Sequence, residues 1–265
     1  MPTFSTVEIS DPAFMPSGLS HVTVKSAALR RRSDLTCYIP PSAAGQKALP
    51  LVILLHGVYG SHWAWLGKGG AHQVLETLLA QAAVAPMMLA MPSDGLFGDG
   101  SGYLRHQDAD YAKWIVEEVP AAAALVDARI TTSPVFITGL SMGGYGALRL
   151  GALHPQIFRA FSGMSSVTCF ENMERFVAAS GHTYRLDESK PLGLAECMLA
   201  QRATLRPFRF DCGTEDILIE ENRALHKALL ETGIPHEYAE HPGGHEWPYW
   251  HQHLADQLRF FADHC

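Results

Sequence analysis

The sequence predicts an α/β protein with a mostly parallel central sheet and helices on both faces. Short continuous apolar runs, such as Leu51–Leu55 and Met87–Met91, are typical of strands that are buried on both faces. Segments with helical spacing separate these runs, and strands that alternate with helices form parallel sheets. A chain of 265 residues suits a single domain, 1–265, of this class.

The composition favours a globular protein without nucleic-acid or membrane partners. Hydrophobic residues make up 47% of the chain and charged residues 18%, which is enough apolar material for a large core. The formal net charge is −7, so the chain lacks the basic surplus that attracts phosphate backbones. No apolar run approaches the length that spans a bilayer.

The amino terminus and the cysteines predict a cytoplasmic location. The first residues contain neither the basic head nor the apolar run of a secretory signal. The five cysteines are odd in number, widely spaced and free of any CxxC pair, which argues against a disulfide framework. The sequence does not define an oligomeric state.

The predicted elements begin with an antiparallel hairpin within His21–Pro40, where two strand-like runs flank a turn. The pattern then predicts strand Leu51–Leu55, helix Ala71–Ala83, strand Met87–Met91, helix Ala109–Ala128, strand Val135–Thr138, helix Gly144–Leu153, strand Ala160–Met164, strand Phe208–Cys212, helix Glu220–Thr232, strand Glu237–Glu240 and helix Trp250–Asp263. Residues 165–206 break this alternation. We expect them to form a small cap-like insertion above the carboxyl ends of the strands.

A G-x-S-x-G motif, from Gly139 to Gly143, lies between a predicted strand and a predicted helix. This setting is typical of the nucleophile elbow of the α/β-hydrolase fold, with Ser141 as the nucleophile. The two glycines leave room for a sharp turn, and the following helix directs its free amides at the reacting carbon. The backbone N–H of Met142 is therefore one predicted oxyanion donor. The alternative is a glycine-rich turn whose serine caps the helix.

A serine hydroxyl needs a base to remove its proton, and His245 is the candidate. It lies between the last predicted strand and the last helix, where this fold places its histidine, and Gly243 and Gly244 let the loop bend. The alternative is an ordinary surface or core histidine. His241 and His245 have a spacing that suits a metal, but Pro242 and the glycines form a turn between them, and no cysteine or carboxylate stands at ligand spacing. We therefore expect no metal.

The acid of the predicted triad follows a late strand. Glu215 and Asp216 both lie on the loop after Gly213. Asp216 is preferred, because a short carboxylate there can accept the Nδ1–H of the imidazole and stabilise the imidazolium. Glu215 is the rival, and a role for Asp216 as a helix cap is the structural alternative.

The strand Leu51–Leu55 runs into His56-Gly57, which is where this fold places its other oxyanion amide. We expect that amide to be the N–H of Val58 rather than that of Tyr59. The aromatic residues expected to line the substrate pocket are Tyr59, Trp63, Trp65 and Trp247. The alternative for the tryptophans is that they pack the core.

These pieces together resemble the esterase D family of α/β-hydrolases, which includes S-formylglutathione hydrolases, short-chain esterases and secreted mycolyltransferases. The matching pieces are His56-Gly57 with Ser61 and Trp65, Met91-Pro92-Ser93 with Gly95 and Tyr103, Gly139–Gly144, Cys212–Asp216 with Asn222 and Leu225, and Pro242–Trp247. They occur in family order from Leu51 to Trp250, which covers most of the chain.

The resemblance implies a Ser141–His245–Asp216 triad, an oxyanion hole from the Val58 and Met142 amides, and no cofactor. It also implies a serine carboxylesterase that cleaves short acyl esters of small molecules through an acyl-enzyme. A thioesterase such as S-formylglutathione hydrolase is the first alternative. However, Cys212 stands where the formylglutathione branch carries Gln. A non-catalytic binding protein on the same scaffold is the second alternative.

Overall fold

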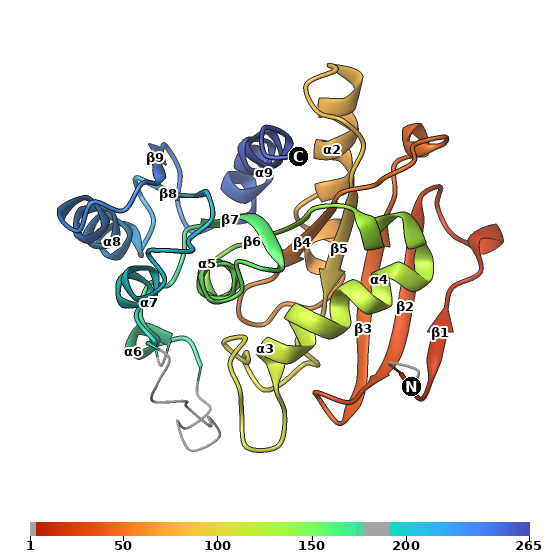
Figure 1. The fold of residues 1–265 in the computed structure, drawn as a ribbon, viewed down its shortest axis with the longest axis horizontal. Coiled ribbons are helices and arrows are strands. Elements are labelled where there is room, and N and C mark those ends of the chain that lie inside the picture. The colour runs from red at the N-terminus through yellow and green to blue at the C-terminus, as the bar shows by residue number, and fades with distance from the viewer. Residues whose placement is uncertain (1–3, 174, 178–190) are drawn as a thin grey trace.

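The computed structural model describes residues 4–173, 175–177 and 191–265, and within them nine strands form one mixed sheet (Figure 1). The strands are β1 (Val7–Ile9), β2 (Leu19–Ser26), β3 (Arg31–Tyr38), β4 (Leu51–Leu55), β5 (Met88–Pro92), β6 (Val135–Gly139), β7 (Phe158–Met164), β8 (Phe208–Gly213) and β9 (Glu237–His241). Their order in the sheet is β1-β2-β3-β5-β4-β6-β7-β8-β9. Strand β2 pairs antiparallel with β1 and β3, and β3 pairs antiparallel with β5. The other neighbours in this order, from β5 through β4 to β9, are parallel.

Helices cover both faces of the sheet, as the sequence predicts (Figure 1). They are α1 (Ala64–Gly67), α2 (Ala71–Ala80), α3 (Tyr111–Lys113), the π-helix η3 (Trp114–Glu118), α4 (Val119–Val126), α5 (Met142–Leu153), α6 (Phe170–Met173), α7 (Leu194–Ala200), α8 (Ile219–Glu231) and α9 (Trp247–Ala262), with short 3₁₀ turns at Pro12–Phe14, Pro41–Ala43 and Ala128–Thr132. Helices α1, α2 and α9 pack on one face, and α3 to α5 with α7 and α8 pack on the other. No helix in the described ranges combines the length and apolar character needed to cross a membrane.

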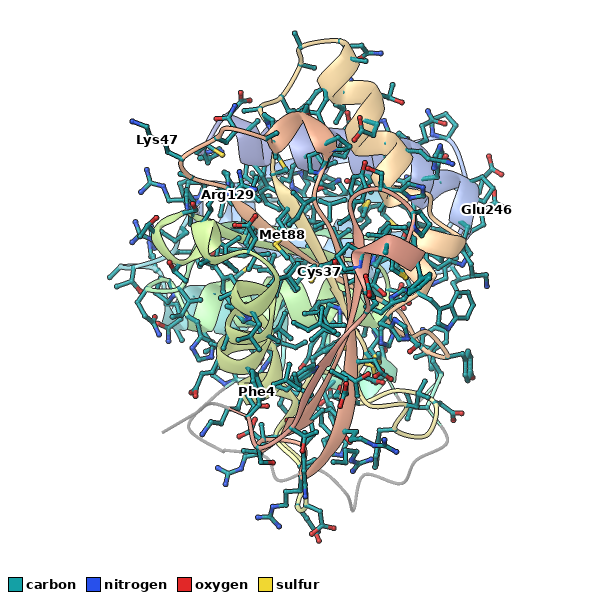
Figure 2. All side chains as sticks on the ribbon, turned by 90° about the vertical axis from the view of Figure 1, so that its right-hand side faces the viewer. Phe4, Cys37, Lys47, Met88, Arg129 and Glu246 are labelled. Atoms are coloured by element: carbon teal, nitrogen blue, oxygen red, sulfur yellow. The ribbon has the colours of Figure 1, made fainter. Side chains whose placement is uncertain are left out.

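The apolar run of β4 is continuous because the strand has a core on each side. Val52 and Leu54 belong to the core beneath α2 and α9, whereas Leu51, Ile53 and Leu55 belong to the core beneath α5. Figure 2 shows Cys37 and Met88 in the interior, with Lys47 and Glu246 at the periphery. Fully burying one aliphatic side chain such as that of Leu54 stabilises the fold by about 1.5–3 kcal/mol.

The predicted element types agree with the structure, and the differences have local causes. The amino-terminal hairpin forms with Leu19 opposite Tyr38. The helix expected over Ala109–Ala128 is a helical run formed by α3, η3 and α4, and Pro120 lies inside it, directly after the π-helix. Strand β1 was not predicted because it has only three residues, all of them exposed.

The predicted insertion at 165–206 contains α6 and α7, and its residues 174 and 178–190 lie outside the described part of the chain. Helix α7 contacts both α5 and α8, so this part of the segment rests on the main body of the fold. The organisation into one domain with a small cap stays a prediction.

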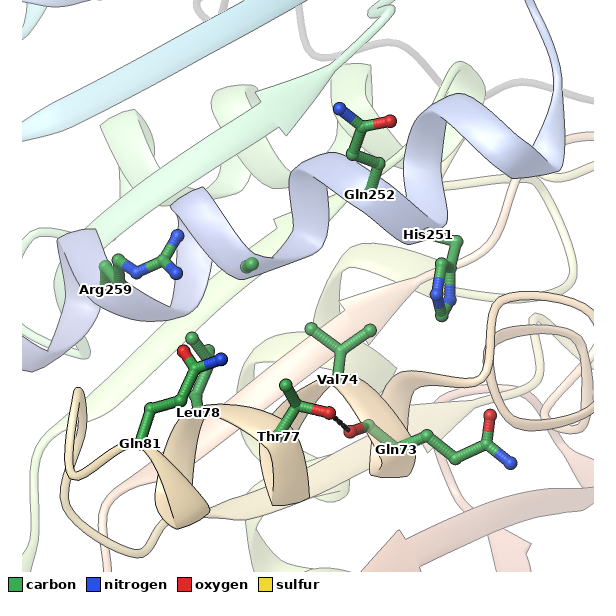
Figure 3. A pocket seen from close by; sticks show the side chains of 9 residues that line it. Gln73, Val74, Thr77, Leu78, Gln81, His251, Gln252 and Arg259 are labelled. Atoms are coloured by element: carbon green, nitrogen blue, oxygen red, sulfur yellow. Dashed lines mark hydrogen bonds between the residues drawn. The ribbon is translucent and has the colours of Figure 1, made fainter.

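A polar groove of about 350 Å³ separates α2 from α9 (Figure 3). Its walls carry Gln73, Thr77 and Gln81 from α2, and His251, Gln252 and Arg259 from α9. The Thr77 hydroxyl donates to the Gln73 carbonyl oxygen, and the His251 ring pairs with the carbonyl oxygen of Gly69. None of the predicted site residues lines this groove. Ser141, Asp216 and His245 instead follow the carboxyl ends of β6, β8 and β9.

The packing of α5 on β7 can be tested at Gly151. A methyl group on Gly151 would lie 2.2 Å from Cγ of Phe161, a buried ring that cannot move aside. We expect Gly151→Ala to lower the free energy of unfolding by about 1–3 kcal/mol through overpacking. The control is Gly67→Ala at the exposed end of α1, where the added methyl lies no closer than 3.3 Å to a side chain. Urea denaturation measures both variants, and a Gly151→Ala protein as stable as the wild type would contradict this packing.

Candidate active site

Ser141 occupies a sharp turn between β6 and α5. Its backbone has φ +54°, a conformation that non-glycine residues rarely adopt. The N–H of Ser141 donates to the carbonyl oxygen of Met164 on β7, at 3.0 Å. A methyl group on Gly143 would lie 2.3 Å from the carbonyl oxygen of Leu55, so only glycine fits there. The predicted elbow is therefore present, with the serine at the amino end of α5.

The structure brings three distant side chains together. His245 Nε2 lies 3.0 Å from Ser141 Oγ, and His245 Nδ1 lies 2.9 Å from Asp216 Oδ2 and 3.0 Å from Asp216 Oδ1. The carboxylate selects the tautomer with a proton on Nδ1, which leaves Nε2 free to accept the hydroxyl proton. Both distances lie within the reach needed for proton transfer.

Two loops at the ends of β8 and β9 hold the acid and the base. A methyl group on Gly213 would lie 2.2 Å from the carbonyl oxygen of Gly243, so the two loops pass each other at backbone contact. The Thr214 N–H donates to the His241 carbonyl oxygen at 2.8 Å. These contacts exist because β8 and β9 are parallel neighbours, so both loops leave the same edge of the sheet.

The carboxylate that meets the imidazole is Asp216 and not its rival Glu215. Asp216 is buried, and the N–H of Leu218 donates to its Oδ1 at 2.8 Å, which holds the carboxylate in place. Glu215 is exposed, and its N–H donates to the Gly243 carbonyl oxygen. The contact with the Leu218 N–H is a local turn before α8. The N-cap residue of α8 is Leu218 and no side chain caps it, so Asp216 is not the helix cap of the alternative interpretation.

Two backbone amides lie next to Ser141 on either side. A methyl group on Gly57 would lie 3.4 Å from Cβ of Ser141, which places the His56-Gly57 loop against the serine. The N–H of Tyr59 is occupied by the Asp99 carbonyl oxygen, at 2.7 Å. Within the described residues, the N–H groups of Val58 and Met142 have no such acceptor. This difference favours Val58 over Tyr59 as the second oxyanion donor.

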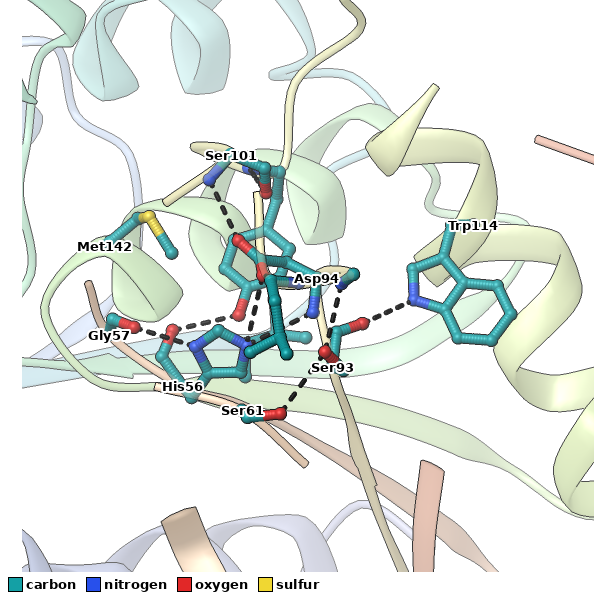
Figure 4. A network of polar contacts seen from close by, with 12 residues as sticks. His56, Gly57, Ser61, Ser93, Asp94, Ser101, Trp114 and Met142 are labelled. Atoms are coloured by element: carbon teal, nitrogen blue, oxygen red, sulfur yellow. Dashed lines mark hydrogen bonds and ion pairs between the residues drawn. The ribbon is translucent and has the colours of Figure 1, made fainter. Parts of the chain in front are cut away.

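A buried polar network supports the Val58 loop, and sequence reasoning assigned it no role (Figure 4). The Tyr103 hydroxyl donates to the His56 carbonyl oxygen at 2.9 Å, and the Asp94 N–H donates to His56 Nε2 at 3.2 Å. Because Nε2 is an acceptor, the proton is on Nδ1, which donates to the Gly57 carbonyl oxygen at 2.7 Å. His56 is thereby held at both ring nitrogens, two residues before Val58.

The loop at 93–103 forms the other half of this network. The Asp94 carboxylate accepts the N–H of Ser101 at 2.9 Å, and Trp114 of the π-helix donates its indole N–H to the Ser93 carbonyl oxygen at 2.8 Å. Burial, and then the negative charge of Asp94, hold the pKa of Tyr103 well above its usual value, so its hydroxyl remains a donor. Only the pairing in space reveals this network, since its members lie on three separate segments.

A pocket of about 200 Å³ opens at Ser141. It is lined by Gly57, Val58, Tyr59, Gly60, Trp63, Ala64, Lys68, Leu140, Ser141, His245, Trp247 and Trp250. Tyr59, Trp63 and Trp247 line it as predicted. Trp65 does not, and that prediction is wrong: its side chain is 1% exposed, because its indole N–H donates to the Leu55 carbonyl oxygen. Trp65 instead packs edge-on behind Trp247, with ring centroids 5.6 Å apart.

A cluster of two histidines and an aspartate joins β9 to α9 and offers the donor types of a metal site. His241, His253 and Asp256 have ligand atoms within 4.8 Å of one another. However, the two imidazole rings are stacked at 4.1 Å and 11°, so their in-plane lone pairs do not converge on one ion. Asp256 pairs instead with His253 Nδ1 at 3.1 Å and with Arg259 at 3.2 Å. The cluster fits two stacked rings with a hydrogen bond from His253 to Asp256 better than it fits a metal site.

Comparisons with known proteins identify the family of the chain. The Esterase family model, described as "Putative esterase", matches residues 26–261, so the chain belongs to this family. An acetyl esterase from Caldicellulosiruptor saccharolyticus is 28% identical over 274 residues, covering 92% of this chain and 98% of that protein. An S-formylglutathione hydrolase from Arabidopsis thaliana is 26% identical over 143 residues, covering 49% of this chain and 50% of that protein.

The solved structures establish the fold. A ferulic acid esterase has a TM-score of 0.75 at 24% identity, with 98% of each chain covered. The sheet order and the elbow described above are those of the α/β-hydrolase fold. Together with its family membership, this makes the protein a serine esterase, the class that the sequence predicts.

The choice of acid can be tested with a matched pair of variants. Asp216→Asn removes the charge that fixes the tautomer of His245, and we expect kcat to fall by roughly 10³–10⁴-fold. Glu215→Gln changes the exposed neighbour and is expected to retain the wild-type kcat. Both are measured with a short aryl ester under saturating conditions. A strong loss in Glu215→Gln with normal turnover in Asp216→Asn would reverse the assignment.

The positioning role of Tyr103 can be tested by Tyr103→Phe. Without its hydroxyl the His56 carbonyl loses a buried donor, so the Val58 amide is held less firmly. We expect kcat to fall by about tenfold with little change in KM.

The control for Tyr103→Phe is Tyr38→Phe, which removes a hydroxyl that donates to Glu76 far from the serine. Each variant loses one hydrogen bond, worth about 1 kcal/mol of stability. Only Tyr103→Phe is expected to lose kcat, and equal kcat values in the two variants would refute the positioning role.

Proposed function

We propose that this protein hydrolyses short-chain acyl esters of small molecules, with Ser141 as nucleophile, His245 as general base and Asp216 as the acid. The observation that carries the proposal is the continuous chain of contacts from Ser141 Oγ through the imidazole to the Asp216 carboxylate. Short acyl chains are favoured because the pocket at Ser141 measures only about 200 Å³. The acetyl esterase relative supports the same substrate class.

The reaction would proceed in two halves. The Ser141 hydroxyl attacks the ester carbonyl while His245 Nε2 takes its proton, and Asp216 stabilises the imidazolium that results. The negative charge that develops on the carbonyl oxygen is met by the N–H groups of Val58 and Met142, and each such donor contributes about 3 kcal/mol. His245 then returns the proton to the departing alcohol, which leaves an acyl-enzyme. Water, activated by His245, hydrolyses it.

A thioester substrate such as S-formylglutathione is the second candidate, since the same groups would serve it. The relative named S-formylglutathione hydrolase supports this candidate over about half of the chain. Cys212, at the position where that branch carries Gln, is buried, and burial raises the pKa of its thiol. Cys212 therefore offers no reactive thiolate to a thioester substrate. The ratio of kcat/KM for formylglutathione to that for a short aryl ester separates the candidates.

The location of the enzyme in the cytoplasm stays a prediction. All five cysteines are free, and Cys37, Cys197 and Cys212 are buried as ordinary core residues. This pattern is compatible with a reducing compartment.

The decisive experiment is Ser141→Ala in a burst assay. The wild type is expected to release one equivalent of alcohol quickly and then to turn over steadily, because the acyl-enzyme accumulates. Ser141→Ala is expected to lose both phases and also to lose covalent labelling by a fluorophosphonate. Ser42→Ala, a change to an exposed serine far from the pocket, serves as the control. Wild-type turnover in Ser141→Ala would exclude the proposed function, and a wild type without turnover or labelling would favour a binding protein.

A further inference from the structure

We propose that Lys68 makes the pocket at Ser141 selective for esters that carry a negative charge, such as a carboxylate, on their acyl or alcohol portion. The proposal rests on the proposed function, because it concerns the substrate of that same site. It specifies the charge of the substrate, which Ser141, His245 and Asp216 do not determine.

Lys68 has a fixed position at the edge of the pocket. It directly follows α1, and its N–H donates to the Ala64 carbonyl oxygen at 2.9 Å. A methyl group on the next residue, Gly69, would lie 2.8 Å from the Trp247 ring, so the backbone here is pressed against that side chain. Lys68 therefore lines the same pocket as Ser141 and His245.

The ammonium group is held by an aromatic ring. Lys68 Nζ lies 5.6 Å from the centroid of the Trp247 ring, within the range of a cation–π contact. The Trp247 ring is itself fixed by edge-on contacts with Trp65 at 5.6 Å and Trp250 at 5.3 Å. The contact keeps the charge beside the pocket without neutralising it, so the ammonium can still pair with an anion.

No acidic side chain of the described residues pairs with Lys68 within 4.0 Å. By contrast, Lys113 and Lys227 each have a glutamate oxygen at 3.8 Å. Apart from Lys68, the described residues that line the pocket are glycine, apolar or aromatic residues, Ser141 and His245. Among the described residues that line the pocket, Lys68 thus carries the one permanent charge, which is positive in a protein whose formal net charge is −7.

This arrangement has a predictable energetic effect. A carboxylate placed against Lys68 gains the attraction of the ammonium beside the apolar faces of Trp63 and Trp247, where the local dielectric constant is lower than in water. Lys68 is exposed, so the gain is modest, and we expect a preference of about fivefold in kcat/KM at low salt. Screening should reduce the preference as the ionic strength rises.

The test uses two pairs of esters that differ only in charge. In the alcohol pair, 3-carboxyphenyl acetate is compared with 3-carbamoylphenyl acetate. In the acyl pair, 4-nitrophenyl hydrogen glutarate is compared with its primary amide, each corrected for uncatalysed hydrolysis. For each pair the readout is the ratio of kcat/KM for the anionic ester to that for the neutral ester, which does not depend on the fraction of active enzyme.

Three variants are compared with the wild type. Lys68→Met keeps the length of the side chain but removes the charge, and Lys68→Arg keeps the charge. Lys47→Met, at a peripheral lysine outside the pocket, is the control for a general change in net charge (Figure 2). We expect Lys68→Met to lower the ratio by about fivefold in at least one pair, whereas Lys68→Arg and Lys47→Met keep it. The pair that responds identifies the portion of the ester that carries the anion.

Two outcomes would overturn the proposal, and they differ from each other. If the wild type turns over these esters but both ratios are the same in Lys68→Met, the charge selectivity is wrong and the esterase function stands. If the wild type turns over none of the four esters, the proposed function itself fails, and this inference fails with it.

Discussion

The site depends on one close contact, that of Gly143 with the end of β4. A methyl group at Gly143 would lie 2.3 Å from the Leu55 carbonyl oxygen and 2.6 Å from that of His56. The contact presses the first turn of α5 against the strand end that leads into Val58. The position of the nucleophile and the position of the second amide are therefore set together, since neither segment can shift without the other.

The acid and the base obey a similar constraint on the other side of Ser141. Their loops leave adjacent parallel strands and cross at Gly213 and Gly243, where the backbones touch. The imidazole of His245 is further confined by the edge-on ring of Trp250, with centroids 5.0 Å apart. Preorganisation of this kind places the reacting groups before substrate arrives, which is the largest contribution that a protein scaffold makes to such a reaction.

The predictable parts of the fold and site were those with a local signal. The continuous apolar run of β4 and the G-x-S-x-G spacing identified a buried strand and an elbow, because burial and tight turns restrict residue type locally. The contacts of His56 with Asp94 and Tyr103 had no such signal, since they join segments that meet only after folding. Trp65 was placed wrongly because a tryptophan suits a pocket wall and a core equally. Its indole N–H donates to the Leu55 carbonyl oxygen in the core, a contact that has no local signal in the sequence.

The π-helix at Trp114–Glu118 gives the site a dependence on helix register. A π turn holds one more residue than an α turn, and each residue of a helix turns it by about 100°. The extra residue therefore changes the angle between the segment before it and the segment after it. Trp114, at its start, reaches the Ser93 carbonyl oxygen at 2.8 Å, while α4, after it, keeps its buried residues in the core. The irregular turn thus lets a distant helix brace the loop that supports the reaction centre, so a more regular helix here would be a poorer scaffold.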